Sequence, residues 1–181
     1  MINKSEYSRK LIHTFNLAIP LFYYFIIPDK WEFLNILILL TLCFIAIDIC
    51  RNLFPAVKSI FSIIFDKMLR GHELNGKFTG ATWVMIASCI SVLLFSKPVA
   101  ILALIFMSLG DTAAGLIGQQ FGKHKIGDKT WEGFFAGLVV CLIISINYNL
   151  LPLHVSISGA CTAMIMEILP IPLDDNFKIP L

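Results

Sequence analysis

The chain has 181 residues, of which 57% are hydrophobic and only 14% are charged. Soluble globular domains carry about 25% charged residues, so this composition, with a mean hydropathy of +0.82, excludes that class of protein. The net charge of +2 gives no sign of a nucleic-acid polymer as the partner. We therefore expect an integral membrane protein.

Six apolar segments follow one another along the chain, each long enough for a transmembrane helix. Lipid leaves only helices or closed barrels as spanning structures, and the period-two alternation of barrel strands is absent, so we expect an all-α polytopic protein. The chain contains no linker, which predicts a single transmembrane domain over residues 1–181. The predicted spans cover about residues 11–28, 31–50, 79–96, 98–118, 132–151 and 152–169.

The distribution of basic residues predicts the orientation of these spans. Twelve of the fourteen Lys and Arg residues fall in the two tails and in the second and fourth loops, whereas only Lys30 and Lys97 fall on the other side. By the positive-inside rule, both termini and these two loops face the cytosol. The asymmetry also favours an even number of spans in the cytoplasmic membrane.

Two further segments have a clear pattern. In the second loop, apolar residues recur at helical spacing after Pro55, which predicts an interfacial amphipathic helix on the cytosolic face. In the C-terminal tail, residues 169–181 contain three prolines, and we expect no helix there. The apolar positions of the predicted interfacial helix are Val57, Ile60, Phe61, Ile64, Phe65 and Met68.

Several acids lie within or at the ends of the predicted spans, all at the cytosolic side. Carboxylates gathered at one depth suggest a common polar cavity that opens to the cytosol. The alternative is that each acid is a local helix cap or the partner in an ion pair. The acids within or at the ends of spans are Asp48, Asp111, Glu132 and Glu167, and Asp174 and Asp175 follow on the same side.

The two interpretations have different weight for different acids. Asp48 precedes Arg51 by three residues, so an ion pair explains it as well as a functional role does. Glu132 would equally suit the first turn of the fifth span, where the helix dipole favours an acid. Asp111 has no basic residue within a helical turn. We therefore expect Asp111 to be functional.

The passage from Gly110 to Gly133 is the most informative part of the chain. Asp111 shares a helical stripe about 60° wide with three glycines. Such stripes are usually packing surfaces, and we expect Gly133-x-x-x-Gly137 to be one. Packing alone does not require an aspartate at the start of the stripe and three lysines after it. A nucleotide with Mg²⁺ does, because carboxylates bind the metal, lysines bind phosphates and glycines allow close approach. The glycines are Gly115, Gly118 and Gly122, and the lysines are Lys123, Lys125 and Lys129.

A second polar cluster precedes the first span. Glu6, Arg9, Lys10 and His13 lie at its cytosolic entry, and a Glu6–Lys10 pair with basic side chains that reach the interface explains them slightly better than a binding site. Arg70 and Glu73, before Thr79-Gly80, have the same ambiguity. The residues themselves leave both possibilities open.

At these positions the chain resembles the CTP-dependent lipid kinases, which include dolichol kinase, phytol kinase and the CTP-using diacylglycerol kinase, and which are related to phosphatidate cytidylyltransferases. The resemblance covers nearly the whole chain, and four motifs occur in the same order. They are Glu6-x-x-Arg9-Lys10-x-x-His13; Leu69-Arg70-x-x-Glu73 followed by Thr79-Gly80-Ala81; Asp111, Ala114, Gly118, Gly122, Lys129, Thr130, Glu132 and Gly133 in the central passage; and Glu167 with Asp174-Asp175-Asn176.

The resemblance implies an enzyme that transfers the γ-phosphoryl group of CTP to the hydroxyl of a membrane lipid alcohol, with Mg²⁺ as cofactor, at the cytosolic face. On this interpretation Asp111 binds Mg²⁺, and Glu132 or Asp175 supplies the second carboxylate. Asp175 is also the candidate general base, and Lys129 is expected to be catalytic. The expected nucleotide-binding residues are Arg9, Lys10, Arg70, Gly115, Gly118, Gly122, Lys123, Lys125, Lys129, Thr130 and Asn176. Asp128 departs from the pattern, since many relatives carry a second basic residue there.

Two other functions are weighed against the kinase. A phosphatidate cytidylyltransferase would use a similar site for attack on the α-phosphate, but the Gly-His-Gly-Gly run of that family is absent from this sequence. A small transporter would place its carboxylates near the midplane between repeats, whereas these lie at one interface and no repeat is found. The sequence does not choose among diacylglycerol, polyprenol and phytol-like alcohols, or between CTP and ATP, and it leaves a homodimer open.

Overall fold

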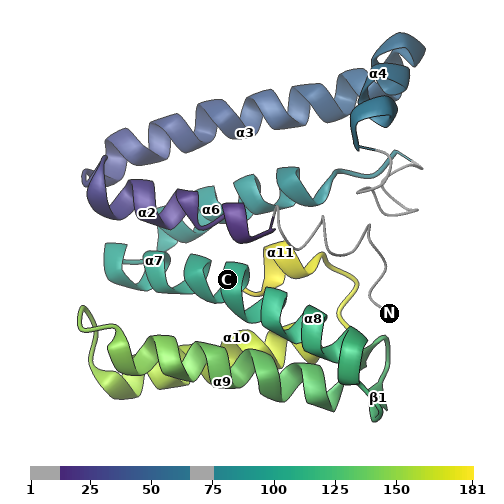
Figure 1. The fold of residues 1–181 in the computed structure, drawn as a ribbon. Coiled ribbons are helices and arrows are strands. Elements are labelled where there is room, and N and C mark those ends of the chain that lie inside the picture. The colour runs from purple at the N-terminus through teal and green to yellow at the C-terminus, as the bar shows by residue number, and fades with distance from the viewer. Residues whose placement is uncertain (1–12, 66–75) are drawn as a thin grey trace.

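A computed structural model describes residues 13–65 and 76–181 of the chain. Figure 1 shows long helices that lie alongside one another and are joined by short connections. The one sheet in the described part is a two-stranded antiparallel hairpin of β1 (Lys125–Ile126) and β2 (Lys129–Thr130). The expected all-α class is therefore confirmed for these residues, apart from the hairpin.

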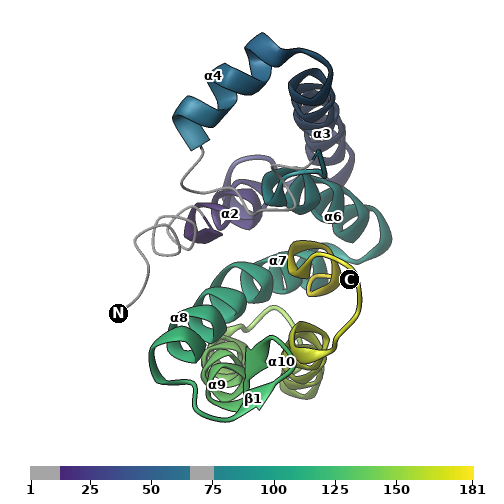
Figure 2. The same cartoon turned by 90° about the vertical axis from the view of Figure 1, so that its right-hand side faces the viewer.

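The helices form two layers, and the short helix α11 (Asp175–Lys178) lies between them (Figure 2). In the second layer, α7, the π-helical segment η1 and α8 form one continuous helix. The first layer contains α2 (Ala18–Phe25), α3 (Lys30–Leu53), α4 (Pro55–Phe65) and α6 (Gly80–Leu94). The second layer contains α7 (Lys97–Ile105), η1 (Phe106–Gly110), α8 (Asp111–Phe121), α9 (Trp131–Asn147) and α10 (Leu153–Ile168).

Polar side chains fix where three of these helices begin. Asp29 accepts hydrogen bonds from the first N–H groups of α3, and Thr79 accepts one at the start of α6. Thr130 accepts one from the Gly133 N–H at the start of α9, with 3.2 Å between the atoms. Because the first N–H groups of a helix have no partner inside the helix, these caps favour the observed starts.

Two buried apolar clusters hold the helices together, and each includes residues of both layers. In the first cluster Tyr23 stacks on Phe33 with 4.4 Å between the ring centroids, which joins α2 to α3. The second cluster includes residues of α8, α9 and α10 and reaches Ile179, near the C-terminus. The first cluster consists of Tyr23, Phe33, Leu34, Leu37, Met85, Val92, Ala100 and Ile101. The second consists of Val84, Leu102, Leu104, Phe106, Met107, Ala114, Cys141, Ala160, Ala163, Met164 and Ile179.

Glycines allow α8 and α9 to pack backbone to backbone. A Cβ atom on Gly133 would lie 2.6 Å from the carbonyl oxygen of Ala114, and one on Gly137 would lie 2.9 Å from that of Gly110. Both distances are too short for a real Cβ atom, so only glycine fits without a shift of the helices. The expectation that Gly133 and Gly137 form a packing surface is therefore confirmed.

Within residues 13–65 and 76–181, two helices are long and apolar enough to cross a membrane, Lys30–Leu53 and the continuous helix Lys97–Phe121. They coincide with the second and fourth predicted spans. The shorter apolar helices α6, α9 and α10 lie in three other predicted spans, and α2 lies in the first. The count of six spans and the cytosolic orientation of both termini stay predictions.

The two patterned segments outside the spans had different outcomes. Helix α4 begins at Pro55, where the amphipathic pattern predicts a helix start, and its described part ends at Phe65. Its place at the membrane surface stays a prediction.

The expectation of no helix in the tail is wrong, because α11 forms between Pro172 and Pro180. The Asp174 side chain accepts a hydrogen bond from the Asn176 N–H at 3.0 Å and so starts this helix.

Candidate functional site

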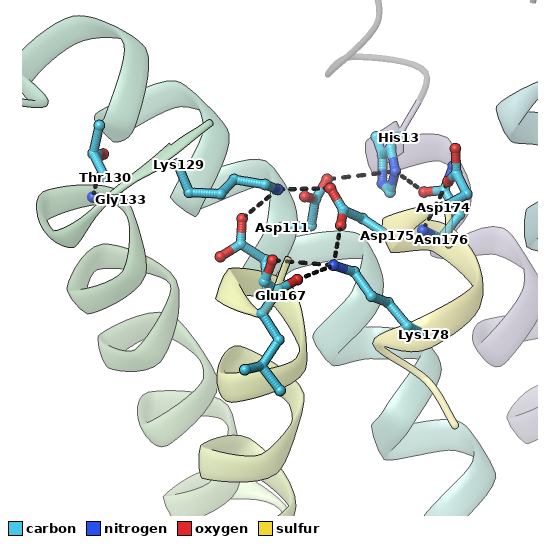
Figure 3. Close-up of polar contacts among 11 residues, drawn as sticks. His13, Asp111, Lys129, Thr130, Gly133, Glu167, Asp174, Asp175, Asn176 and Lys178 are labelled. Atoms are coloured by element: carbon cyan, nitrogen blue, oxygen red, sulfur yellow. Dashed lines mark hydrogen bonds and ion pairs between the residues drawn. The ribbon is translucent and has the colours of Figure 1, made fainter. Parts of the chain in front are cut away.

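Three carboxylates from distant parts of the chain converge at one place (Figure 3). Asp111 is the first residue of α8, Glu167 lies near the end of α10, and Asp175 begins α11. One oxygen of each group lies within 4.8 Å of an oxygen of each of the others. Asp111 and Glu167 are only 5% and 3% exposed. Because like charges so close together repel in a buried place, this carboxylate cluster requires cations.

Two lysines supply positive charge to the carboxylate cluster. Nζ of Lys129 lies 2.7 Å from Oε1 of Glu167 and 2.6 Å from Oδ2 of Asp175. Nζ of Lys178 lies 3.0 Å from Oδ1 of Asp175. Burial by itself would lower the pKa of the Lys129 ammonium, but the charges of Asp175, Asp111 and Glu167 outweigh it and raise this pKa above the ordinary lysine value. Lys129 therefore stays charged at physiological pH.

The helix is unusual directly before Asp111. The five residues of η1, Phe106–Gly110, form a π-helical turn, a widening of the helix that is frequent at functional sites. The turn is tightly enclosed, since a Cβ atom on Gly110 would lie 2.6 Å from Sγ of Cys141. Asp111 thus starts a new α-helical stretch from a fixed position in the core.

His13 connects the start of the described chain to the carboxylate cluster. Its Nε2 is hydrogen-bonded to Oδ1 of Asn176 and lies 3.5 Å from Oδ2 of Asp111. Nδ2 of Asn176 donates to the carbonyl oxygen of Gly80 at 3.2 Å, which orients Oδ1 towards the histidine. His13 and Asn176 are both buried. The N-terminal segment, α6 and α11 therefore meet beside Asp111.

The carboxylate cluster borders a cavity of about 620 Å³. Helix α8 and the hairpin supply much of the polar lining, and Gly127 of the hairpin has a φ of +58° at the first position of the two-residue turn. The end of α10 and the connection to α11 supply much of the apolar lining. The polar lining includes Asp111, Gly115, Gly118, Gln119, Asp128, Lys129 and Thr130, and the apolar lining includes Phe134, Ile168, Leu169, Ile171 and Leu173. A charged group and a hydrocarbon chain can therefore both be accommodated next to the carboxylates.

The glycines and the threonine predicted for nucleotide binding have different positions. Gly115 and Gly118 line the cavity. Gly118 and Gly122 also pack against Thr130, since added Cβ atoms would lie 2.8 Å and 2.9 Å from its Oγ1. The Thr130 hydroxyl caps α9. Helix packing and capping thus account for Gly122 and Thr130 without a ligand.

The structure does not bring Glu132 into the carboxylate cluster. Its Oε1 lies 2.6 Å from Nδ1 of His124, and both of its oxygens accept hydrogen bonds from the His124 N–H. Glu132 lines a separate surface pocket together with Lys123. Its carboxylate therefore closes the loop that leads into the hairpin, and Glu167 takes the place expected for it. Lys123 and Lys125 are exposed and do not line the cavity.

Asp48 is the partner of Arg51, the alternative that the sequence left open. Its Oδ1 lies 3.2 Å from Nη2 of Arg51. Its Oδ2 accepts hydrogen bonds from the Thr79 N–H at 2.8 Å and from the Thr82 hydroxyl at 2.7 Å. Both charged side chains are buried. Asp48 therefore joins α3 to the start of α6, and it is not one of the carboxylates at the cavity.

Arg9, Lys10 and Arg70 lie outside the described residues. Three residues at the site were not given a role from the sequence. Glu167 belonged to the group of acids at the cytosolic ends of spans, and His13 belonged to the N-terminal motif, so each carried a signal. Lys178 carried none, because it is a single lysine in a tail that the prolines made appear irregular.

Comparison with known proteins finds relatives over most of the chain. An uncharacterised protein of Rickettsia prowazekii is 26% identical over an alignment of 186 positions, which covers 97% of this chain and 90% of that protein. CTP-dependent diacylglycerol kinase 1 of Saccharomyces cerevisiae is 26% identical over 152 residues, which cover 78% of this chain and 51% of the kinase. A probable chloroplastic phytol kinase of Triticum aestivum is 30% identical over 122 residues, which cover 56% of this chain and 41% of that protein.

No family model and no solved structure matches the chain. The chain spans about half the length of the named kinases that it matches. These distant homologues, named as CTP-dependent diacylglycerol kinases and phytol kinases, support the CTP-dependent lipid kinase family for this chain. The four motifs predicted the same family.

Proposed function

We propose that this protein is a lipid kinase that transfers the γ-phosphoryl group of CTP to the hydroxyl of a membrane lipid alcohol at the cytosolic face of the membrane. The observation that carries the proposal is the meeting of Asp111, Glu167 and Asp175 with Lys129 at a cavity whose lining is partly apolar. The relationship to CTP-dependent kinases supports the choice of donor.

The carboxylate cluster fits a divalent cation of the Mg²⁺ type. Its donors are all carboxylate oxygens, the ligands that hard cations prefer, and they come from three separate elements. Three carboxylates thus share two lysine ammonium groups, those of Lys129 and Lys178. Asp111, Glu167 and Asp175 would hold Mg²⁺, and the bound ion would neutralise charge on the phosphates of the donor.

The side chains around the cluster suggest how the substrates lie. Lys129 reaches into the cavity from the hairpin and would contact phosphate oxygens of the nucleotide. The apolar residues Ile168, Leu169 and Ile171 would contact the hydrocarbon chain of the acceptor. In the transfer, the acceptor oxygen forms a bond to the γ-phosphorus, the bond to the β–γ bridging oxygen breaks, and CDP leaves. The hydroxyl proton is released to a base, for which Asp175 is our candidate.

A labelling assay tests this function. Purified protein in detergent is given mixed lipid alcohols, Mg²⁺ and CTP that is labelled in either the γ- or the α-phosphate. We expect label to enter lipid from the γ-position only, and the labelled lipid identifies the acceptor. A parallel reaction with labelled ATP tests the choice of nucleotide.

The same assay separates the kinase from its nearest rival. A phosphatidate cytidylyltransferase would transfer label from the α-position to lipid when phosphatidate is supplied. Label from the α-position alone would therefore reject the kinase and support a CDP-lipid synthase. Absence of label from either position, with protein that remains folded and with each lipid class supplied, would reject both.

A further inference from the structure

The two lysines that contact Asp175 are held in different ways. Lys178 is only 4% exposed in its side chain, and it also donates a hydrogen bond to the carbonyl oxygen of Leu169 at 2.8 Å. Lys129 is 31% exposed, and its hydrogen bonds in the described structure go to the carboxylates of Glu167 and Asp175. Lys178 is therefore fixed to the backbone at the end of α10, whereas Lys129 depends on the carboxylates alone.

The partners of Lys129 are two of the three groups proposed to bind the metal. A divalent cation on Glu167 and Asp175 would compete with the ammonium for these carboxylates and would repel it at short distance. Lys129 lies on a two-residue strand next to the Gly127 turn and lines the cavity. It can therefore move into the cavity when its carboxylate partners are taken, while the carbonyl contact holds Lys178 in place.

We infer that Lys129 exchanges partners during each cycle. In the free protein its ammonium neutralises Glu167 and Asp175 in place of a metal. When metal and nucleotide bind together, the metal takes the carboxylates and Lys129 moves to the phosphate oxygens. The identity of the nucleotide rests on the proposed function. The exchange couples the two ligands, because metal alone has to displace Lys129 without offering it a new partner.

Direct binding of Mn²⁺, measured by the paramagnetic resonance signal of the free ion without nucleotide, tests the exchange. We expect Lys129→Met to bind Mn²⁺ about tenfold more tightly than the wild type, because no ammonium competes for the carboxylates. Lys129→Arg keeps the charge and should bind it as the wild type does. Lys125→Met removes an exposed charge from the same hairpin and should change the affinity less than about twofold.

Two results in this series would overturn the exchange. One is that Lys129→Met binds Mn²⁺ no more tightly than the wild type. The other is that Lys125→Met strengthens binding as much as Lys129→Met does, because the effect would then come from general charge and not from Lys129 as the resident cation.

A measurement on the wild type covers the case in which Lys129→Met does not fold. Amine-reactive labelling followed by mass spectrometry reports how free each lysine is, and Lys125 serves as the internal control. We expect Mn²⁺ to increase the labelling of Lys129 several-fold and CTP with Mn²⁺ to suppress it again. Labelling of Lys129 that Mn²⁺ leaves unchanged or lowers would contradict the exchange.

The outcomes also separate this inference from the function on which it rests. If Asp111→Asn binds Mn²⁺ as the wild type does, the proposed metal site is wrong and the exchange is rejected with it. If Mn²⁺ displaces Lys129 but no γ-label reaches lipid, the kinase is rejected and the competition stands.

Discussion

The buried acids Asp48 and Asp111 lie on helices of different layers and have different surroundings. Asp48 has its counter-ion Arg51 three residues away, and its other oxygen is surrounded by hydrogen-bond donors of Thr79 and Thr82. Asp111 instead meets two further carboxylates from other elements, at a cavity. The first arrangement satisfies a buried charge and joins two helices. The second gathers three carboxylates, two lysines and a histidine at a cavity, an arrangement that is typical of a functional site.

The largest effect that this comparison predicts is on activity. Asp111→Asn should lower phosphoryl transfer at least about a thousandfold, because the proposed metal site would lose a charged ligand. Thermal unfolding in detergent should change little, since the amide keeps the size of the side chain. A variant that keeps more than a tenth of wild-type turnover would remove Asp111 from the metal site.

Asp48→Asn should show the reverse pattern. Arg51 would be left buried without its counter-ion, which costs about 3–5 kcal/mol of stability. Turnover per folded molecule should stay close to that of the wild type. Unfolding in detergent and activity are measured on the same preparation, and loss of activity at full stability would assign Asp48 to the catalytic machinery.

Glu167→Gln tests whether the third member of the carboxylate cluster contributes to metal binding. We expect the Mg²⁺ concentration for half-maximal activity to rise about ten- to hundredfold, since one of the three proposed ligands would lose its charge. The change should appear when activity is measured against Mg²⁺ concentration at each fixed CTP concentration. An unchanged Mg²⁺ titration would show that Glu167 only balances the charge of Lys129.

Gly133→Ala tests the packing between α8 and α9. The added methyl group would meet the carbonyl oxygen of Ala114, so we expect a loss of about 1–3 kcal/mol in stability. Activity per folded molecule should fall less than in Asp111→Asn. The matched control is Gly127→Ala in the exposed hairpin turn, where the open space around the residue leaves only its positive φ as a source of strain.

The smallest effect is expected for Glu132→Gln, which breaks the contact with His124 outside the cavity. The equilibrium constant for unfolding and the activity should both stay within about twofold to threefold of the wild-type values, as for most surface changes. A rise in the Mg²⁺ concentration for half-maximal activity like that expected for Glu167→Gln would restore Glu132 as a candidate metal ligand.

The sequence predicted features that depend on local pattern. Apolar length located the helices, Pro55 marked the start of α4, and the absence of a basic residue within a helical turn of Asp111 in the sequence singled that acid out. It failed where the answer depends on which distant elements meet. Glu132 and Glu167 are both glutamates near the end of a predicted span. Only the packing of α10 against α9 decides which one faces Asp111. The role of Lys178 depends likewise on α11, which the prolines of the tail concealed.

The most direct test of the account is a parallel measurement of γ-label transfer in the wild type, Asp48→Asn and Asp111→Asn, each corrected for the amount of folded protein. We predict that Asp48→Asn transfers label to lipid at close to the wild-type rate while Asp111→Asn does so at a rate near background. Equal losses in both variants, or transfer that survives in Asp111→Asn, would contradict the assignment of one acid to structure and the other to catalysis.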